Sequence, residues 1–224
     1  MTWILPPPAQ PFVAVEGTAD RFPVRRIFCV GRNYAEHARE FGNDPDREPP
    51  FFFLKPADAV IASGGTLPYP SCTSDFHYEA ELVVALKGGG SNIPEADAPG
   101  LIFGHAAGND LTRRDLQAEA KAMRRPWDMA KGFDASAVLG PIRPGPITDG
   151  TIRCLVNSTV RQEAKLSDMI WSVPGIIAHL SRLVALAPGD LIMTGTPAGV
   201  GALLKGDRCE VTIDGLAPAT VTIA

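Results

Sequence analysis

Short apolar segments, each closed by glycine, proline or a polar turn, limit what this chain can fold into. The runs at residues 26–31, 51–54 and 78–86 have the length and composition of strands. Residues 101–109 predict a strand or a turn, and further strands are predicted at 152–157, 190–194 and 210–213. Because the strands outnumber the helices and do not alternate regularly with them, the pattern favours a β-rich α+β fold over a doubly wound one.

Three segments have the pattern of helices. One begins at Asn33, a second at Thr112 and continues to about Met123, and a third covers residues 173–186 with amphipathic spacing. Five prolines within residues 2–25 favour an extended arm over a helix. We therefore expect an N-terminal arm at 1–24, followed by one domain at 25–224.

The composition of the chain limits the kinds of molecule that it is expected to bind. A formal net charge of -4 with 21 Lys and Arg residues provides no large basic surface, so nucleic-acid binding is not expected. A small anionic substrate is compatible with a bound metal or a few well-placed cations. No apolar run reaches the roughly 20 residues of a membrane span, and the four cysteines form no C-x-x-C pair. We expect a cytoplasmic protein with reduced thiols.

Glu79 and Glu81 are the first candidates for chemistry. They are two residues apart in a predicted strand, so their carboxylates point to the same face. Two adjacent negative charges repel each other unless a cation or a shared proton compensates them, which favours a hard divalent metal. On spacing alone, a solvent-facing strand edge with two ordinary acids is an equal alternative.

Asp110 provides a third carboxylate, after a glycine-containing segment and before a predicted helix. Three oxygen ligands leave open positions on an octahedral ion for water and a chelating substrate. This donor set favours Mg²⁺ or Mn²⁺ over zinc. Taken alone, Asp110 is also compatible with a simple turn residue.

His37 and Glu40 are three residues apart in the helix that begins at Asn33, so they share a face and could act as a base and its partner. Tyr34 lies on the same stripe. A solvated helix face is the alternative interpretation. Lys131, between an aromatic residue and a glycine, is either a cation directed at an oxyanion or a surface lysine.

The segment 194–199 follows a predicted strand as a turn whose hydroxyl and N–H groups could bind a carboxylate. It lacks the Gly-Lys-Ser/Thr ending of a phosphate loop, so nucleotide binding is not expected.

Taken together, four motifs in a fixed order strongly resemble the fumarylacetoacetate hydrolase family over about residues 25–224. They are Gly31-Arg-Asn-Tyr-Ala-Glu-His37, Glu79-Ala-Glu-Leu-Val-Val84, Asn109-Asp-Leu-Thr-Arg-Arg-Asp115 and Pro188-Gly-Asp-Leu-Ile-Met-Thr-Gly-Thr-Pro-Ala-Gly-Val-Gly201. The resemblance implies a rolled mixed β-sheet, usually in a homodimer, and a Mg²⁺ or Mn²⁺ centre. It implies metal ligation by Glu79, Glu81 and Asp110, a catalytic pair of His37 and Glu40, and substrate contact by Lys131.

Within the family, the segments 51–58, 112–117 and 125–134 look most like the members that cleave fumarylpyruvate in gentisate breakdown. The resemblance thus implies hydrolysis of a 2,4-diketo acid to fumarate and pyruvate, with a small anionic 2-oxo acid as substrate. Candidate substrate contacts are Arg32, Tyr34, Lys55, Arg113, Arg114, Gln117, Thr194, Gly195 and Thr196. Alternatives are acylpyruvate hydrolysis, oxaloacetate decarboxylation, isomerisation of a 2-oxo diacid, or a catalytically silent metal-binding homologue.

Overall fold

The computed structural model describes residues 3–35, 49–147 and 149–224. Across these ranges an eight-stranded sheet forms the centre of the molecule, in the order β4-β3-β15-β8-β9-β11-β5 with β12 paired to β9. β3 pairs parallel with β15, and β5 with β11, whereas the other pairs are antiparallel, so the sheet is mixed. The strands are β3 (Arg26–Gly31), β4 (Phe51–Lys55), β5 (Val60–Ala62), β8 (Ala80–Leu86), β9 (Ile102–Asp110), β11 (Ala137–Leu139), β12 (Arg143–Pro144) and β15 (Asp190–Met193).

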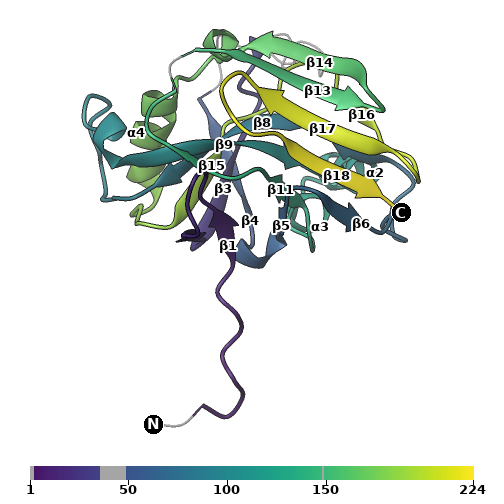
Figure 1. The fold of residues 1–224 in the computed structure, drawn as a ribbon, viewed down its shortest axis with the longest axis horizontal. Coiled ribbons are helices and arrows are strands. Elements are labelled where there is room, and N and C mark those ends of the chain that lie inside the picture. The colour runs from purple at the N-terminus through teal and green to yellow at the C-terminus, as the bar shows by residue number, and fades with distance from the viewer. Residues whose placement is uncertain (1–2, 36–48, 148) are drawn as a thin grey trace.

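A second sheet of five strands, in the order β14-β13-β17-β18-β6, is stacked on the central sheet (Figure 1). Its strands are β6 (Gly65–Leu67), β13 (Thr151–Val156), β14 (Thr159–Lys165), β17 (Arg208–Ile213) and β18 (Ala219–Ile223). Successive side chains along each strand point to opposite faces, and apolar side chains from the two sheets meet between them. The buried cluster there includes Leu82, Ala107, Val138, Ile152, Val211 and Val221.

The same face of the central sheet is also covered by helix α4 (Val173–Leu183), which contributes Ile176, Ile177 and Leu180 to a cluster with Val84 and Leu86. On the opposite face, Val83 and Ala85 form a third cluster with the hairpin of β1 (Phe12–Ala14) and β2 (Arg21–Pro23). Both faces of β8 are therefore buried.

Smaller elements close one end of the central sheet. A three-stranded sheet has the order β10 (Thr112–Arg113), β7 (Phe76–Tyr78), β16 (Gly201–Ala202). Helices α2 (Arg114–Ala122) and α3 (Asp128–Lys131) follow β10, and the short 3₁₀ turns are η1 (Ala57–Ala59), η2 (Ala98–Leu101) and η3 (Leu166–Asp168). None of the helices in the described ranges has the length and hydropathy needed to cross a bilayer.

The predicted β-rich fold with a curled mixed sheet is confirmed, and β3 coincides with the predicted strand. The predicted strand at 78–86 is wrong at its start, because the chain leaves β7 at Tyr78 and joins β8 at Ala80. At the crossing, the Glu79 N–H donates to the Asn109 side chain (3.0 Å) and the Ala80 N–H to that of Gln162 (3.0 Å). At this position the side-chain amides of Asn109 and Gln162 accept the backbone hydrogen bonds that a neighbouring strand would otherwise accept.

The predicted helix start at Thr112 is also wrong. Thr112 and Arg113 form β10, and the Thr112 hydroxyl donates to the Asp110 carbonyl rather than capping a helix. The amphipathic helix begins as predicted at Val173, where the Ser172 hydroxyl accepts from the Gly175 N–H, but it ends at Leu183. It ends there because residue 186 pairs with residue 90 in an isolated bridge. The predicted helix from Asn33 lies largely outside the described residues.

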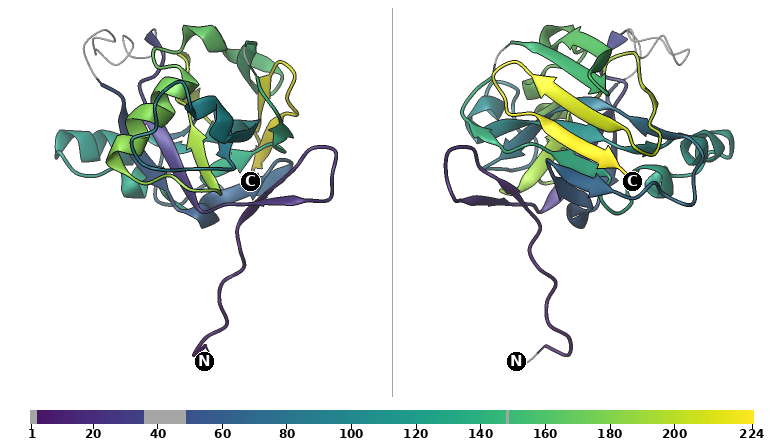
Figure 2. Two further views of the ribbon diagram at one scale, coloured as in Figure 1. Left: turned by 90° about the vertical axis from the view of Figure 1, so that its left-hand side faces the viewer. Right: turned by 45° about the vertical axis from the view of Figure 1, so that its right-hand side comes forward.

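Ahead of β1, the segment 3–10 extends away from the body of the molecule without regular structure (Figures 1 and 2). Its Trp3, Ile4 and Leu5 side chains are 80%, 100% and 75% exposed. Further along, Val13 and Phe22 of the hairpin are buried in the core. The prolines therefore keep only the first part of the predicted arm extended and apart.

Candidate active site

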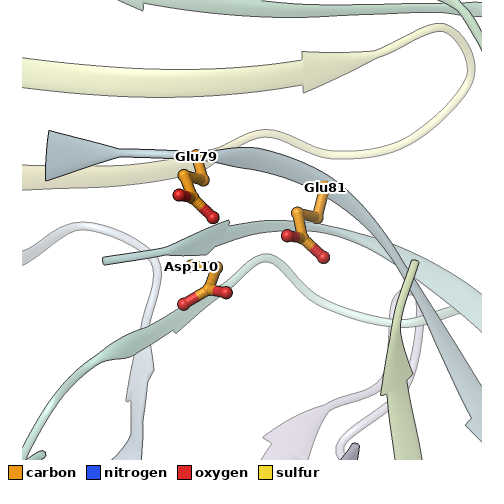
Figure 3. Close-up of side chains that lie close together, drawn as sticks. All are labelled: Glu79, Glu81 and Asp110. Carbon is orange, nitrogen blue, oxygen red and sulfur yellow. The ribbon is translucent and has the colours of Figure 1, made fainter. Parts of the chain in front are cut away.

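Three carboxylates meet where β7, β8 and β9 end or begin. Glu79 lies between β7 and β8, Glu81 is the second residue of β8, and Asp110 is the last residue of β9. Their ligand atoms lie within 4.8 Å of one another, and Figure 3 shows the two glutamates on the same side of their chain, facing Asp110. The side chains are 5%, 1% and 0% exposed, so the solvent-facing alternative is excluded.

Three cations contact this cluster. Lys131 Nζ lies 2.6 Å from Glu79 Oε2 and 2.8 Å from Asp110 Oδ2. Lys55 Nζ lies 2.8 Å from Asp110 Oδ1, and Arg114 Nη2 lies 2.5 Å from Glu79 Oε1. Lys55 and Lys131 are both fully buried, so these ion pairs are shielded from water and depend on each other.

The electrostatics of the cluster favour added positive charge. Burial, followed by the charges of Asp110 and Glu79, raises the pKa of Glu81 well above its usual range, although Lys131 and the Gly195 N–H act in the opposite direction. Burial lowers the pKa of Lys131, but Asp110 and Glu79 outweigh it and raise that pKa overall. The cluster therefore keeps Lys131 charged but disfavours the ionised form of Glu81, and either a bound cation or a proton on this carboxylate would offset the repulsion.

The donor set fits a hard divalent ion. Asp110 Oδ1 is buried and lies 2.8 Å from the Lys55 ammonium, so this oxygen is already paired with a cation in the structure. Three carboxylates without sulfur or imidazole match Mg²⁺ or Mn²⁺, so Glu79, Glu81 and Asp110 are the residues that could hold the ion.

A cavity opens above the cluster. Its lining includes seven of the residues predicted from sequence, which are Arg32, Glu79, Glu81, Arg114, Gln117, Lys131 and Thr196. The Gln117 side chain accepts from Arg114 Nη1 at 2.7 Å, which ties helix α2 to the acidic cluster. Sequence and structure thus agree on most of the cavity wall.

Four other candidates lie behind that wall. Lys55 donates to the Leu111 carbonyl at 3.3 Å and to the Lys131 carbonyl. These bonds hold its ammonium in place beside Asp110, with which it forms an ion pair. The Gly195 N–H donates to Glu81 Oε2 at 2.7 Å, and the Thr194 hydroxyl to the Leu82 carbonyl at 3.0 Å. In this structure these three residues support the cluster instead of facing the cavity.

Tyr34, the fourth, is 2% exposed, and its hydroxyl has no hydrogen-bond partner among the described residues. Burial and the charge of Glu81 raise its pKa, so it stays protonated and remains a candidate donor. Arg113 packs over the Phe133 ring and donates to the Met129 carbonyl, away from the cavity lining. His37 and Glu40 lie outside the described residues.

Part of the cavity wall was not predicted from the sequence, because Phe51, Phe53, Lys121 and Trp127 also line the cavity. The signal for Lys121 was its position four residues after Gln117 in a helix, which places both on one face. His77 links Asp75 to Arg114. Its Nε2 lies 2.7 Å from Asp75 Oδ1, and its Nδ1 accepts a hydrogen bond from Arg114 Nε at 3.4 Å.

The family model of the fumarylacetoacetate hydrolase C-terminal region matches residues 26–224. The chain therefore belongs to the fumarylacetoacetate hydrolase family, whose members include hydrolases and isomerases.

Among solved structures, the chain is similar to a fumarylpyruvate hydrolase from Pseudomonas aeruginosa in complex with Mn²⁺ and pyruvate. The TM-score is 0.97 at 47% identity, covering 100% of this chain and 99% of that one. It is 42% identical to a Ralstonia fumarylpyruvate hydrolase over 183 residues, which is 80% of this chain and 95% of the relative. It is also 41% identical over 196 residues to a mitochondrial oxaloacetate tautomerase from Rattus norvegicus, covering 86% and 88% of the two chains.

Proposed function

We propose that this protein is a metal-dependent hydrolase that cleaves the carbon–carbon bond of a 2,4-diketo acid, with fumarylpyruvate as substrate and fumarate and pyruvate as products. The observation that carries the proposal is the cluster of three buried carboxylates under a cavity with a cationic wall. The two similar fumarylpyruvate hydrolases support the choice of substrate.

Glu79, Glu81 and Asp110 would hold Mg²⁺ or Mn²⁺, and the Mn²⁺ of the Pseudomonas aeruginosa relative supports this assignment. When bound, the ion supplies Lewis-acid polarisation of the substrate's 2-oxo acid end. Lys131 holds two of these carboxylates in place and carries a positive charge at the edge of the cavity. Negative charge that develops on a substrate oxygen there is stabilised by this ammonium.

His37, paired with Glu40, acts as the general base in this proposal. It takes a proton from water as the water oxygen adds to the C4 carbonyl of the substrate. The C3–C4 bond then breaks, its electron pair remains on C3, and a proton returned from the base converts C3 to the methyl group of pyruvate. The added oxygen remains on the other product as a fumarate carboxylate, so the net change is the addition of one water molecule.

A tautomerase is the second candidate, because the oxaloacetate tautomerase relatives are as similar in sequence as the Ralstonia hydrolase. That reaction moves a proton between carbon and oxygen of a 2-oxo diacid and leaves its carbon skeleton intact. The same carboxylate cluster and base serve both reactions, so product analysis has to separate them.

The test is pyruvate release from fumarylpyruvate, acetylpyruvate and oxaloacetate, after chelation and again after addition of Mg²⁺ or Mn²⁺. Keto–enol exchange of oxaloacetate is followed in parallel. We expect metal-restored pyruvate release that is fastest with fumarylpyruvate and is lost in His37→Ala. Metal-dependent tautomerisation without pyruvate release would establish the second candidate, and metal binding without either reaction would indicate a silent homologue.

A further inference from the structure

Two cations of the cavity wall lie on a pair of aromatic rings. The Arg32 guanidinium lies 5.3 Å from the centroid of the Phe51 ring, and Lys121 Nζ lies 5.0 Å from that of Trp127. The two rings are in edge-to-face contact, with centroids 5.2 Å apart and planes at 85°. All four residues line the same cavity as Glu79 and Glu81.

The chain makes room for this arrangement at Gly31. A Cβ atom on Gly31 would lie 2.0 Å from Cζ of the Phe51 ring, so a larger residue there would displace the ring. The next residue, Arg32, has a φ of 60°, a left-handed conformation that a non-glycine residue rarely adopts. Strain of this kind persists where the surrounding structure requires it, often at a binding site.

Helix α2 provides the second cation. Arg114, Gln117 and Lys121 are spaced at i, i+3 and i+7, so one face of the helix points into the cavity. Arg114 contacts the carboxylate cluster at its N-terminal end, and Lys121 lies two turns further along. The helix therefore presents positive charge along the cavity, beginning at the carboxylate cluster.

The two cations are close enough to repel each other. Burial, followed by the charges of Arg114 and Arg32, lowers the pKa of Lys121 to about 8. Positive groups gathered beside one cavity are stabilised when an anion binds between them. The aromatic rings beneath them favour their charged forms and limit the positions they adopt.

We propose that Arg32 and Lys121, placed on Phe51 and Trp127, form the subsite for the second carboxylate of a dianionic substrate. The assignment rests on the proposed function, in which the 2-oxo acid end occupies the carboxylate cluster. The far carboxylate then meets Arg32 and Lys121, and the acyl chain between them lies against the aromatic wall. The subsite selects 2-oxo acids that carry a second carboxylate over monoanionic ones.

The test compares fumarylpyruvate with acetylpyruvate, which has the same reacting bond and no second carboxylate. In Lys121→Met and Arg32→Met, we expect the ratio of kcat/KM for fumarylpyruvate to that for acetylpyruvate to fall at least about tenfold, because a charge-assisted contact is lost. Lys121→Arg should keep most of the ratio. Lys205→Met, at an exposed turn lysine that does not line the cavity, is the matched control and should leave the ratio unchanged.

Equal losses of kcat/KM for both substrates would leave the ratio unchanged, indicate a purely structural role and overturn the proposal. Values of kcat/KM that stay at the wild-type level for both substrates would overturn it as well. Calorimetric binding of fumarate and of crotonate, in which a methyl group replaces one carboxylate, separates the subsite from the reaction. If no diketo acid is hydrolysed, fumarate binding that weakens in Lys121→Met still supports the subsite. If fumarylpyruvate is hydrolysed and fumarate binding does not depend on Lys121, the subsite is wrong and the function stands.

Discussion

The Lys131 ammonium lies 2.6 Å from Glu79 Oε2, and both side chains are buried. The glutamate follows β7 and the lysine ends α3, 52 positions later. The same ammonium reaches Asp110, so one cation bridges carboxylates from two parts of the chain.

Replacing Lys131 by Met should therefore destabilise the metal-free protein. Glu79 and Asp110 would lose their shared buried cation, and loss of one partner of a buried ion pair costs about 3–5 kcal/mol. Urea denaturation measures the change, with exposed Lys87→Met as the control. Saturating Mn²⁺ should recover part of the loss, because it supplies positive charge to the same carboxylates. A variant as stable as the wild type without metal would contradict this account of the cluster.

Asp110→Asn should weaken metal binding by more than about 10–100-fold. That range is the usual loss of metal affinity when a residue that only hydrogen-bonds to a ligand is removed. The substitution keeps the shape of the side chain but removes the negative charge and one hard oxygen ligand. A calorimetric titration with Mn²⁺ gives the dissociation constant of the metal. Asp97→Asn, at an exposed position, is the control. Unchanged affinity in Asp110→Asn would exclude this carboxylate as a ligand.

His105 should make a contribution to stability that is lost between about pH 7 and pH 5. Burial, and to a lesser degree Arg143, lowers the pKa of His105 in the folded state, while its contact with the Gly145 carbonyl opposes the shift. The unfolded chain, with a His pKa near 6.5, then binds more protons than the folded one, so stability is present above that pH and falls as acid is added. One such proton gives a slope of at most about 1.4 kcal/mol per pH unit.

Denaturation of wild type and His105→Gln from pH 8 to pH 5 measures this slope. The variant should show a flatter dependence over the range. The pKa of His77 is also lowered, by burial and by Arg114. Measuring His77→Gln alongside therefore separates the contribution of His77 to the slope from that of His105. Identical slopes in wild type and both variants would rule out these histidines as the source.

We expect a homodimer in which the N-terminal segment contributes to association. Trp3, Ile4 and Leu5 are exposed, and the N-terminal segment extends away from the body of its own chain (Figure 2). Covering such side chains in an interface is favourable. Deleting residues 1–10 should raise the dissociation constant of the dimer at least about tenfold in sedimentation experiments. Leu204→Ala, at an exposed leucine elsewhere, is the control. A monomer at all concentrations, with or without the segment, would refute the expectation.

Much of the local structure could be predicted from the sequence. The apolar runs of β3 and β4 identify strands because a short apolar run bounded by turn residues is a local property of the sequence. The spacing of Glu79 and Glu81 predicts a shared face, and the motifs around them resemble a family that the matched residues 26–224 confirm. These conclusions depend on residues close together in the chain.

Contacts between distant segments required the tertiary structure. The break at Glu79 depends on the Asn109 and Gln162 amides, and the sequence around residue 79 contains no sign of them. Lys55 resembles an accessible cation in sequence, yet sheet pairing places it beneath Asp110.

Lys121 and Arg32 meet at one cavity only because Trp127, which follows α2, packs against Phe51 at the start of β4. The sequence by itself determined the apolar strands β3, β4 and β15 and the three acidic side chains, since these follow from local composition and spacing. The tertiary structure decided which cations neutralise those acids and which line the cavity, because strand register and helix packing bring together residues that no local pattern relates.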